Sequence, residues 1–265
     1  MSGAVAGVLF HERCQFENSI YRYVPPLGDL RALRRAALRL PDRFAKRAGE
    51  GKPSRYAVGD FVRVLDRDAV RATLDANDAL RGLTFTDAQW SYCGKTLRVQ
   101  TVVRRMMNDA GRLRKIARSV ALEGATCDGP QRDGGCGRAC PLLFRDEWLE
   151  PSSPELAEPQ THARFARVKP LEQIVATLDR DGRRHGVMFA PAMAQYAGGR
   201  FPVHKRVDPI AANIWRRAYG EWYVLTGVRC LGEVLNGDAP CHRGCGLLWH
   251  ADWLDFEPEL GPAPT

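Results

Sequence analysis

The sequence has no apolar run approaching the roughly 20 residues that a transmembrane helix needs, so it predicts no membrane-spanning helix. It also contains no P-loop, no glycine-rich dinucleotide motif, no Ser-His-Asp signature and no catalytic carboxylate pair. These absences exclude the enzyme classes that depend on such motifs. If the protein is an enzyme, a bound metal must carry the chemistry.

The N-terminal segment lacks the features of a signal peptide. Residues 1–10 are mildly apolar but have neither a basic n-region nor a proper h-region. We therefore expect a cytoplasmic protein whose eight cysteines stay reduced. In that setting, cysteines act as metal ligands more often than they form disulfides.

The net charge of +8 suits an anionic partner. Nucleic acid is not the favoured partner, because the basic residues are spread along the chain and no aromatic–basic run of the RNP type occurs. One basic helix is predicted over residues 29–40, capped by Asp29. We favour a helix docked on a domain over an arm that binds nucleic acid or an anionic membrane.

The strongest feature is an internal repeat. Phe61-Val-Arg-Val64 matches Phe165-Ala-Arg-Val168, and Ala72-Thr-Leu-Asp75 matches Ala176-Thr-Leu-Asp179, an offset of 104 residues (176 − 72). The offset is 103 at a lone cysteine (230 − 127) and 105 at a Cys-x3-Cys pair (241 − 136). Such small shifts fall in loops, where insertions are tolerated. The pattern predicts a tandem duplication.

Both units have the same predicted elements. In the first unit, residues 59–65 form a turn and a strand, 66–76 a helix, and 96–105 and 119–124 two strands around a turn at 108–111. The Cys-x3-Cys pair then opens an amphipathic segment with helical spacing. The predicted fold is mainly β (α+β): a tandem duplication of a small SH3-like barrel, each copy with a helical insert and a cysteine-rich metal-binding tail.

These elements divide the chain into five parts. Composition indicates a proline-rich linker between the units and a proline- and glycine-rich tail that we expect to be disordered. The parts are an N-terminal arm with the basic helix (1–55), the first repeat (56–150), the linker (151–160), the second repeat (161–257) and the tail (258–265).

The repeat sorts the eight cysteines into two sets. The first set has four thiols, enough for one Zn²⁺ or one iron–sulfur cluster: Cys93, Cys127, Cys136 and Cys140. The second repeat supplies Cys230, Cys241 and Cys245, and has Ala197 where the first has Cys93. Either Cys14, the one cysteine left over, completes this second site, or the site keeps an open position as catalytic metal centres do.

Three features favour iron–sulfur clusters, of the 4Fe–4S type, over two zinc ions. Neither Cys pair has the x2 spacing of structural zinc knuckles, and Cys140-Pro141 is similar to the Cys-Pro ending of ferredoxin-type motifs. A pair at a helix start also turns backbone N–H groups toward a negatively charged cluster. Two zinc ions are the alternative.

Several motifs together resemble a family of short, functionally uncharacterised bacterial proteins that look like single copies of this unit and carry all four cysteines. They are Gly59-Asp-Phe-Val-Arg-Val, Thr73-Leu-Asp, Gly82-Leu, Tyr92-Cys-Gly-Lys, Leu122-Glu-Gly, Cys127-Asp-Gly, Gly134-Gly-Cys136, Cys140 and Trp148-Leu. The likeness covers residues 55–150 closely and 160–255 more loosely, and implies that the first site is the ancestral one. The opening Gly-Asp-x-Val-Arg-Val is also similar to the SH3-like domain of nitrile hydratase β subunits, which implies a fold and transfers no catalytic residue.

The sequence supports three functional hypotheses. The first is a small iron–sulfur enzyme, in which one cluster is structural or relays electrons and an open second cluster acts on a small-molecule substrate. The others are a zinc-stapled binding module for nucleic acid or a protein partner, and a two-cluster electron-transfer protein with a redox partner. Residues near the second site that suit substrate binding, proton transfer or metal ligation are Arg229, Glu233, His242, Arg243 and His250.

Overall fold

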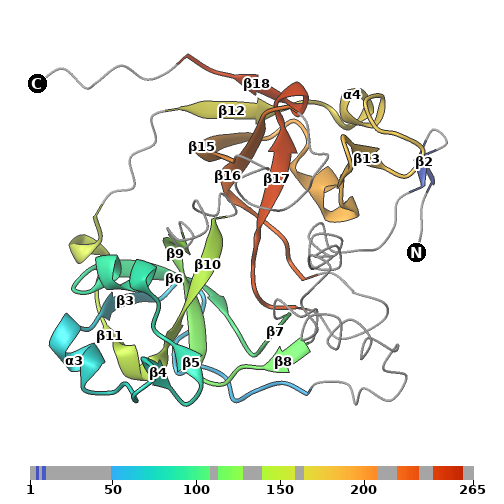
Figure 1. Cartoon of the computed structure of the whole chain (residues 1–265). Coiled ribbons are helices and arrows are strands. Elements are labelled where there is room, and N and C mark those ends of the chain that lie inside the picture. Colours follow the sequence, from blue (N-terminus) through green and yellow to red (C-terminus); the bar gives the residue numbers. More distant parts are fainter. Residues whose placement is uncertain are drawn as a thin grey trace, which may run out of the picture.

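The computed structural model describes residues 4–5, 8–9, 49–107, 113–127, 139–158, 164–207, 220–232 and 241–258. Within these residues the fold is mainly β and is dominated by two five-stranded antiparallel sheets (Figure 1). Cys14, the helix predicted over 29–40, the turn at 108–111, Cys136, Glu233 and most of the C-terminal tail lie outside the described residues.

The first sheet has the strand order β10-β9-β6-β3-β11. Strand β3 alternates between buried and partly exposed residues, because one of its faces packs on a core and the other approaches solvent. Its strands are β3 (Phe61–Val64), β6 (Thr96–Val102), β9 (Ser119–Cys127), β10 (Cys140–Arg145) and β11 (Leu149–Pro151).

The second sheet has the corresponding order β17-β16-β15-β12-β18. Its register matches that of the first: Val99 pairs with Leu122 beside a β-bulge in one sheet, and Val203 pairs with Leu225 beside a β-bulge in the other. Its strands are β12 (Phe165–Val168), β15 (Arg200–Val207), β16 (Trp222–Arg229), β17 (Gly246–His250) and β18 (Leu254–Phe256).

Short elements connect the long strands. Residues 67–71 and 171–175 form single helical turns at corresponding places in the two units. The helical turns are α3 (Arg67–Arg71) and α4 (Leu171–Val175). The 3-10 helices are η1 (Asp87–Tyr92), η3 (Asp146–Trp148), η4 (Pro154–Leu156), η5 (Pro191–Tyr196) and η6 (Ala251–Trp253). The two-stranded pairs are β1–β2 (Ala4–Val5, Val8–Leu9), β4–β5 (Ala79–Leu80, Leu83–Thr84), β7–β8 (Arg105–Met107, Leu113–Lys115) and β13–β14 (Arg183–Arg184, Val187–Met188).

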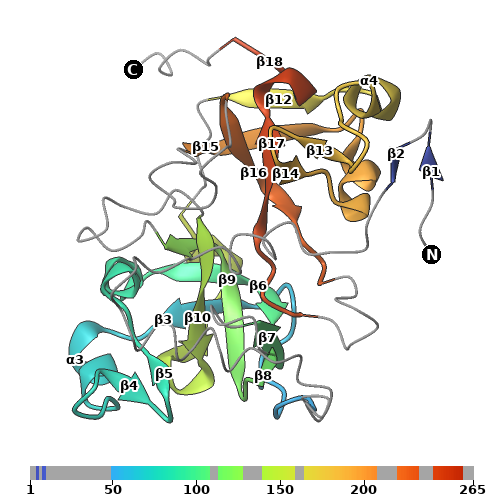
Figure 2. The same cartoon turned by 45° about the vertical axis from the view of Figure 1, so that its right-hand side comes forward.

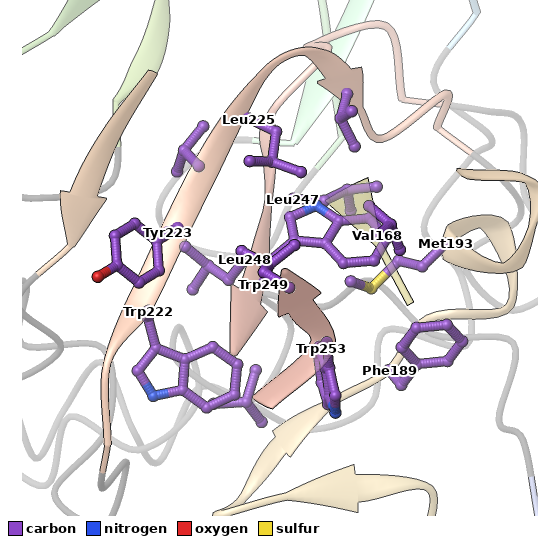
Figure 3. Close-up of a cluster of buried hydrophobic side chains, with 14 of the residues drawn as sticks. Val168, Phe189, Met193, Trp222, Tyr223, Leu225, Leu247, Leu248, Trp249 and Trp253 are labelled. Atoms are coloured by element: carbon purple, nitrogen blue, oxygen red, sulfur yellow. The ribbon is translucent and has the colours of Figure 1, made fainter. Parts of the chain in front are cut away.

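Each sheet folds over its own aromatic core. In the second unit Trp222, Trp249 and Trp253 are fully buried. Trp249 and Trp253 each meet Phe189 edge to face, and Trp222 meets Trp253 in the same way (Figure 3). The indole N–H of Trp253 donates to Thr177 Oγ1 at 2.8 Å, and that of Trp148 donates to Thr73 Oγ1 at 2.9 Å in the first core. Corresponding tryptophans therefore satisfy their polar edge in the same way.

Two predicted helices differ from the structure. The helix predicted over 66–76 is only the turn α3, since the Asp75 carboxylate accepts the N–H groups of Asn77 and Ala79 and directs the chain into a turn. The helix-like segment predicted after each Cys-x3-Cys pair is wrong. It is strand β10 in one unit and β17 in the other, because a short, fully buried apolar run has no periodicity that separates strand from helix.

Two segments at the edges of the first predicted repeat, the linker and the end of the N-terminal arm, contact the first unit. Much of the predicted linker is ordered: Pro151 lies in β11, Ser152 donates its N–H to Phe61 O at 2.9 Å, and η4 follows. Residues at the end of the predicted arm pack on the first unit, where Arg55 Nη2 donates to Leu149 O at 2.7 Å. The first sheet therefore extends one residue beyond the predicted 56–150 limits, to Pro151, and chain before residue 56 packs on the first unit.

Candidate metal centres and the seam between the sheets

The first candidate centre lies where β9 and β10 end together, which we call the first corner. Cys127 and Cys140 are direct partners in the register of these strands. Cys127 packs against the core of its own sheet, as does Cys93. The sequence placed these thiols far apart, and the hairpin brings two of them opposite each other.

Cys93 reaches the same corner through its neighbour Tyr92. The Tyr92 hydroxyl accepts the Thr126 N–H and donates to Gly124 O, both at 3.2 Å, so the end of η1 is fastened to the end of β9. Burial raises the pKa of the Cys93 thiol, and the nearby cation of Arg67 opposes part of this effect. Burial thus favours the protonated form of the Cys93 thiol.

The second candidate centre lies where β16 and β17 end, which we call the second corner. The N–H of Cys230 donates to Cys245 O at 2.8 Å, and the N–H of Cys241 donates to Gly232 O at 3.3 Å. The Gly232 N–H in turn donates to Cys230 Sγ at 3.4 Å. Three cysteines are thereby tied to one corner, and a backbone donor faces one of the sulfurs.

Gly232 is required for that arrangement. It has a φ of +77°, and a Cβ at this position would lie 1.8 Å from the Cys241 carbonyl oxygen. Only glycine allows this backbone conformation and this close approach together. The second corner is thus built so that the chain after Cys230 meets the chain at Cys241.

Ala197 occupies the place of Cys93 in the second unit. It ends η5 as Cys93 ends η1, and the preceding Tyr196 donates its hydroxyl to Arg229 O at 3.1 Å. The anchoring tyrosine is therefore present in both units, whereas the thiol is present in the first unit alone.

The thiols approach one another without forming a finished metal site. Among the described residues, no three Cys, His, Asp or Glu side chains converge closely enough to hold one metal ion. Two of the eight predicted ligands, Cys14 and Cys136, lie outside those residues. What fits a metal is the donor set: reduced thiols gathered in pairs at the ends of rigid hairpins, with backbone hydrogen bonds that fix their main chain.

His242 lies between the two units. Its backbone N–H donates to Arg105 O at 2.8 Å, and its Nδ1 accepts the Arg104 N–H at 3.3 Å. Burial lowers the pKa of His242, and the Arg105 cation lowers it further, while Glu50 opposes them. Glu50 also pairs with Arg104 at 2.6 Å. The structure therefore gives His242 a binding partner in the first unit.

The other two predicted residues have different surroundings. His250 is buried, and its Nδ1 accepts the Asp252 N–H at 3.1 Å, so this nitrogen caps η6. Arg243 is partly buried beside Cys245 in the segment before β17.

The ends of the two hairpins meet along a seam, formed by Gln100, Thr101 and Thr126 on one side and by His204 and Arg229 on the other (Figure 2). Arg229 Nη1 donates to Gln100 O and to Thr101 Oγ1, both at 3.0 Å. Thr126 Oγ1 contacts His204 Nε2 at 3.4 Å.

These contacts are reciprocal. By the repeat offsets, Thr126 corresponds to Arg229 (229 − 126 = 103) and Gln100 corresponds to His204 (204 − 100 = 104). Thr126 of the first unit contacts His204 of the second, and their equivalents Arg229 and Gln100 make the same contact with the units exchanged. Such reciprocity is the property of a two-fold, isologous interface.

The seam is hollowed by a half-open cavity of about 60 Å³, within a space of about 520 Å³ that includes open solvent at its mouth. Residues at corresponding positions of both units line it. The pairs are Gln100 and His204, Leu122 and Leu225, Glu123 and Thr226, Gly124 and Gly227, Ala125 and Val228, Thr126 and Arg229, Ala139 and Gly244, and Pro141 and Gly246.

Sequence reasoning missed this cavity. The repeated Leu-x-Gly of β9 and β16 was a usable signal, because a glycine with positive φ at both places marks where the two strands bend.

Comparison with known proteins gives no family for this chain: no family model matches it, and no curated protein is significantly similar. Within the described residues, the helices are too short and too polar to cross a membrane.

Proposed function

We propose that the protein binds two metal centres through cysteine thiolates, one at each corner, and that these centres staple the hairpin ends that meet at the seam. The observation that carries the proposal is the matched placement of cysteines. Cys127 lies opposite Cys140 in one sheet, and the backbone N–H of Cys230 donates to the backbone carbonyl of Cys245 in the other. Cysteines at equivalent hairpin ends suit tetrahedral thiolate ligation.

Each centre has its own ligand set in this proposal. The first comprises Cys93, Cys127, Cys136 and Cys140. The second comprises Cys230, Cys241 and Cys245, with Cys14 as the fourth ligand. The Gly232 N–H that faces Cys230 Sγ supports Cys230 as a ligand, because a hydrogen-bond donor of this kind stabilises a ligating thiolate.

We propose Zn²⁺ as the metal. The sequence favoured an iron–sulfur cluster because a Cys-x3-Cys pair at a helix start would turn backbone N–H groups toward its negative charge. Cys140 instead lies in strand β10, and Cys245 lies just before strand β17. Stapling of small β units by four thiolates is the usual role of structural zinc. The protein is then a metal-stapled binding module.

A second candidate is an iron–sulfur protein with an open second cluster, acting as an enzyme or in electron transfer. Ala197 favours it, since the second corner lacks from its own sheet the ligand that Cys93 supplies in the first. A cluster with one unoccupied position offers a Lewis-acid iron. The Cys140-Pro141 dipeptide supports a cluster in the first corner.

We further propose that the two units arose by tandem duplication of an SH3-like barrel. The equal strand order, the equal register at the bulges and the reciprocal seam support a fused two-fold pair.

The test is metal and acid-labile sulfide analysis of the full chain, purified anaerobically without chelators. We expect two zinc ions per chain in the wild type, and one in Cys127→Ser and in Cys230→Ser. Thr126→Ala, a neighbouring change that keeps every thiol, is the matched control and retains both. Acid-labile sulfide with broad visible absorption selects the iron–sulfur candidate. A wild-type chain without bound metal contradicts both.

The same preparation decides the role of Cys14. If Cys14→Ser releases one metal ion, Cys14 closes the second centre. If both ions remain in Cys14→Ser, the second centre has an open position.

A further inference from the structure

The cavity at the seam has chemistry that the metal centres do not use. Thr126 and Arg229 line it, whereas the next residues along each strand, Cys127 and Cys230, pack against the cores of their own sheets. Successive side chains of a strand point to opposite faces. The thiols are therefore directed away from the cavity, and a ligand there does not compete with a metal ion.

Arg229 brings an incompletely used cation to this cavity. Its Nη1 donates to Gln100 O and Thr101 Oγ1, while its Nε and Nη2 donate to no described residue. Burial lowers the pKa of Arg229, and Glu123 opposes that effect without forming an ion pair with it among the described residues. A partly desolvated guanidinium gains when an anion occupies its open edge.

A second polar group in the cavity lining lacks a partner. The hydroxyl oxygen of Thr226 is buried and has no hydrogen-bond partner among the described residues. A buried hydroxyl in this state costs about 1–3 kcal/mol relative to a bonded one. A bound group that offers a hydrogen bond removes the cost.

Glycine keeps the space beside Arg229 open. A Cβ at Gly244 would lie 3.4 Å from Thr101 Oγ1 and 3.8 Å from Arg229 Cδ, and Gly244 has a φ of +66°. Gly227 lines the same cavity with a φ of +79°, and a Cβ there would meet no atom within 4 Å. Backbone thus replaces side chains where a ligand would enter.

We propose that this cavity binds the carboxylate of a small molecule, with the Nε–Nη2 edge of Arg229 as its bidentate partner and the Thr226 hydroxyl as an additional donor. The planar edge of a guanidinium matches a carboxylate. A volume of 60 Å³ holds about two water molecules, which is the size of a carboxylate and its attached carbon. The rest of the molecule extends through the mouth.

Charge selects a carboxylate over a phosphate group. Arg229 contributes one positive charge and Glu123 one negative charge to the lining, so the site is balanced before a ligand enters. A singly charged ligand leaves a net charge of one, whereas a phosphate dianion meets the repulsion of Glu123 with a single arginine to offset it.

Titration of the full-length chain with sodium acetate, followed by ¹⁵N–¹H correlation spectra, tests the proposal. Sodium chloride at equal ionic strength is the salt control. We expect saturable shifts of the Gly227 and Gly244 amides and of the Arg229 Nε–H, with a dissociation constant on the order of millimolar for so small a probe. Arg229→Gln weakens binding at least about tenfold. Arg200→Gln, which alters an exposed arginine of the same unit, leaves it unchanged.

Glu123→Gln gives an independent test that leaves Arg229 in place. Removal of the like charge should tighten acetate binding about threefold. The proposal is overturned if acetate shifts are scattered over the basic surface, if Arg229→Gln binds as the wild type does, or if Glu123→Gln has no effect. Tighter binding of inorganic phosphate than of acetate overturns the assignment of a carboxylate.

Discussion

The two units share a scaffold and differ in the residues at their corners and at the seam. Strand order, bulge register and the tryptophan–threonine hydrogen bonds match between the sheets. Cys93 and Ala197 differ at the corner, and Thr126 and Arg229 differ at the seam. Buried packing is therefore the same in both units, whereas the residues at the corner and at the seam have diverged.

A third difference lies in the buried residue that ends the second-last strand of each sheet. In the first unit Arg145 donates to three backbone carbonyls, those of Leu80, Arg81 and Ala117. Burial lowers the pKa of Arg145. In the second unit the equivalent His250 makes a local cap with Asp252 instead. The first unit therefore depends on a buried cation to hold its loops, and the second does not.

The largest expected effect comes from the shared frame. Trp148→Ala and Trp253→Ala should each lower the free energy of unfolding by about 4 kcal/mol, because each removes a fully buried indole and its hydrogen bond to threonine. Urea unfolding followed by circular dichroism measures both. Trp→Phe at the same positions keeps an aromatic ring and should cost less. A large loss of stability in one variant with none in the other would show that the two cores are not equivalent.

The next effect concerns the buried cation. Arg145→Met should cost about 3 kcal/mol, since it leaves three carbonyls without their donor. The exposed neighbour substitution Arg81→Met is the control and should change the stability little, although it removes a surface ion pair with Glu147. Equal stabilities of the two variants in urea would show that Arg145 does not hold the loops.

The corner difference is testable by adding a ligand. In a Cys14→Ser background, Ala197→Cys places a thiol where Cys93 stands in the first unit, and should raise the affinity of the second centre about tenfold, because it restores a fourth thiolate ligand. Chelator competition measures the affinity. Ala194→Cys, placed one helical turn earlier in η5, is the matched control. An equal gain in both variants would mean that the added thiol acts without reaching the centre.

The smallest effect is expected at the seam. His242→Ala removes the acceptor of the Arg104 N–H and should cost about 1 kcal/mol. Hydrogen exchange at the Arg104 amide should accelerate, while exchange at Val99, inside the first sheet, stays unchanged. Faster exchange at both amides would indicate that His242 supports the sheet rather than the seam.

Sequence patterns predicted the mainly β fold and several of its strands. Phe61–Val64, Thr96–Val102 and Ser119–Cys127 are strands, as the alternation indicated. They missed β10 and β17, whose continuous burial gives no period. The seam could not be predicted from the sequence, because Arg229 and Gln100 are 129 residues apart and no local pattern indicates a contact between them.

The candidate ligands could be grouped from the sequence, but their geometry could not. Spacing assigned Cys127 and Cys140 to one set, whereas only the pairing of β9 with β10 places them opposite each other. His242 shows the limit of proximity along the chain: it is next to Cys241, and its hydrogen bonds go to the first unit.

X-ray absorption at the edge of whichever metal the purified full-length protein retains tests the central claim most directly. The proposal predicts a first shell dominated by sulfur at about 2.3 Å in a four-coordinate centre. A first shell made only of nitrogen and oxygen at about 2.0 Å would show that the metal is bound elsewhere on the protein and would contradict the thiolate centres.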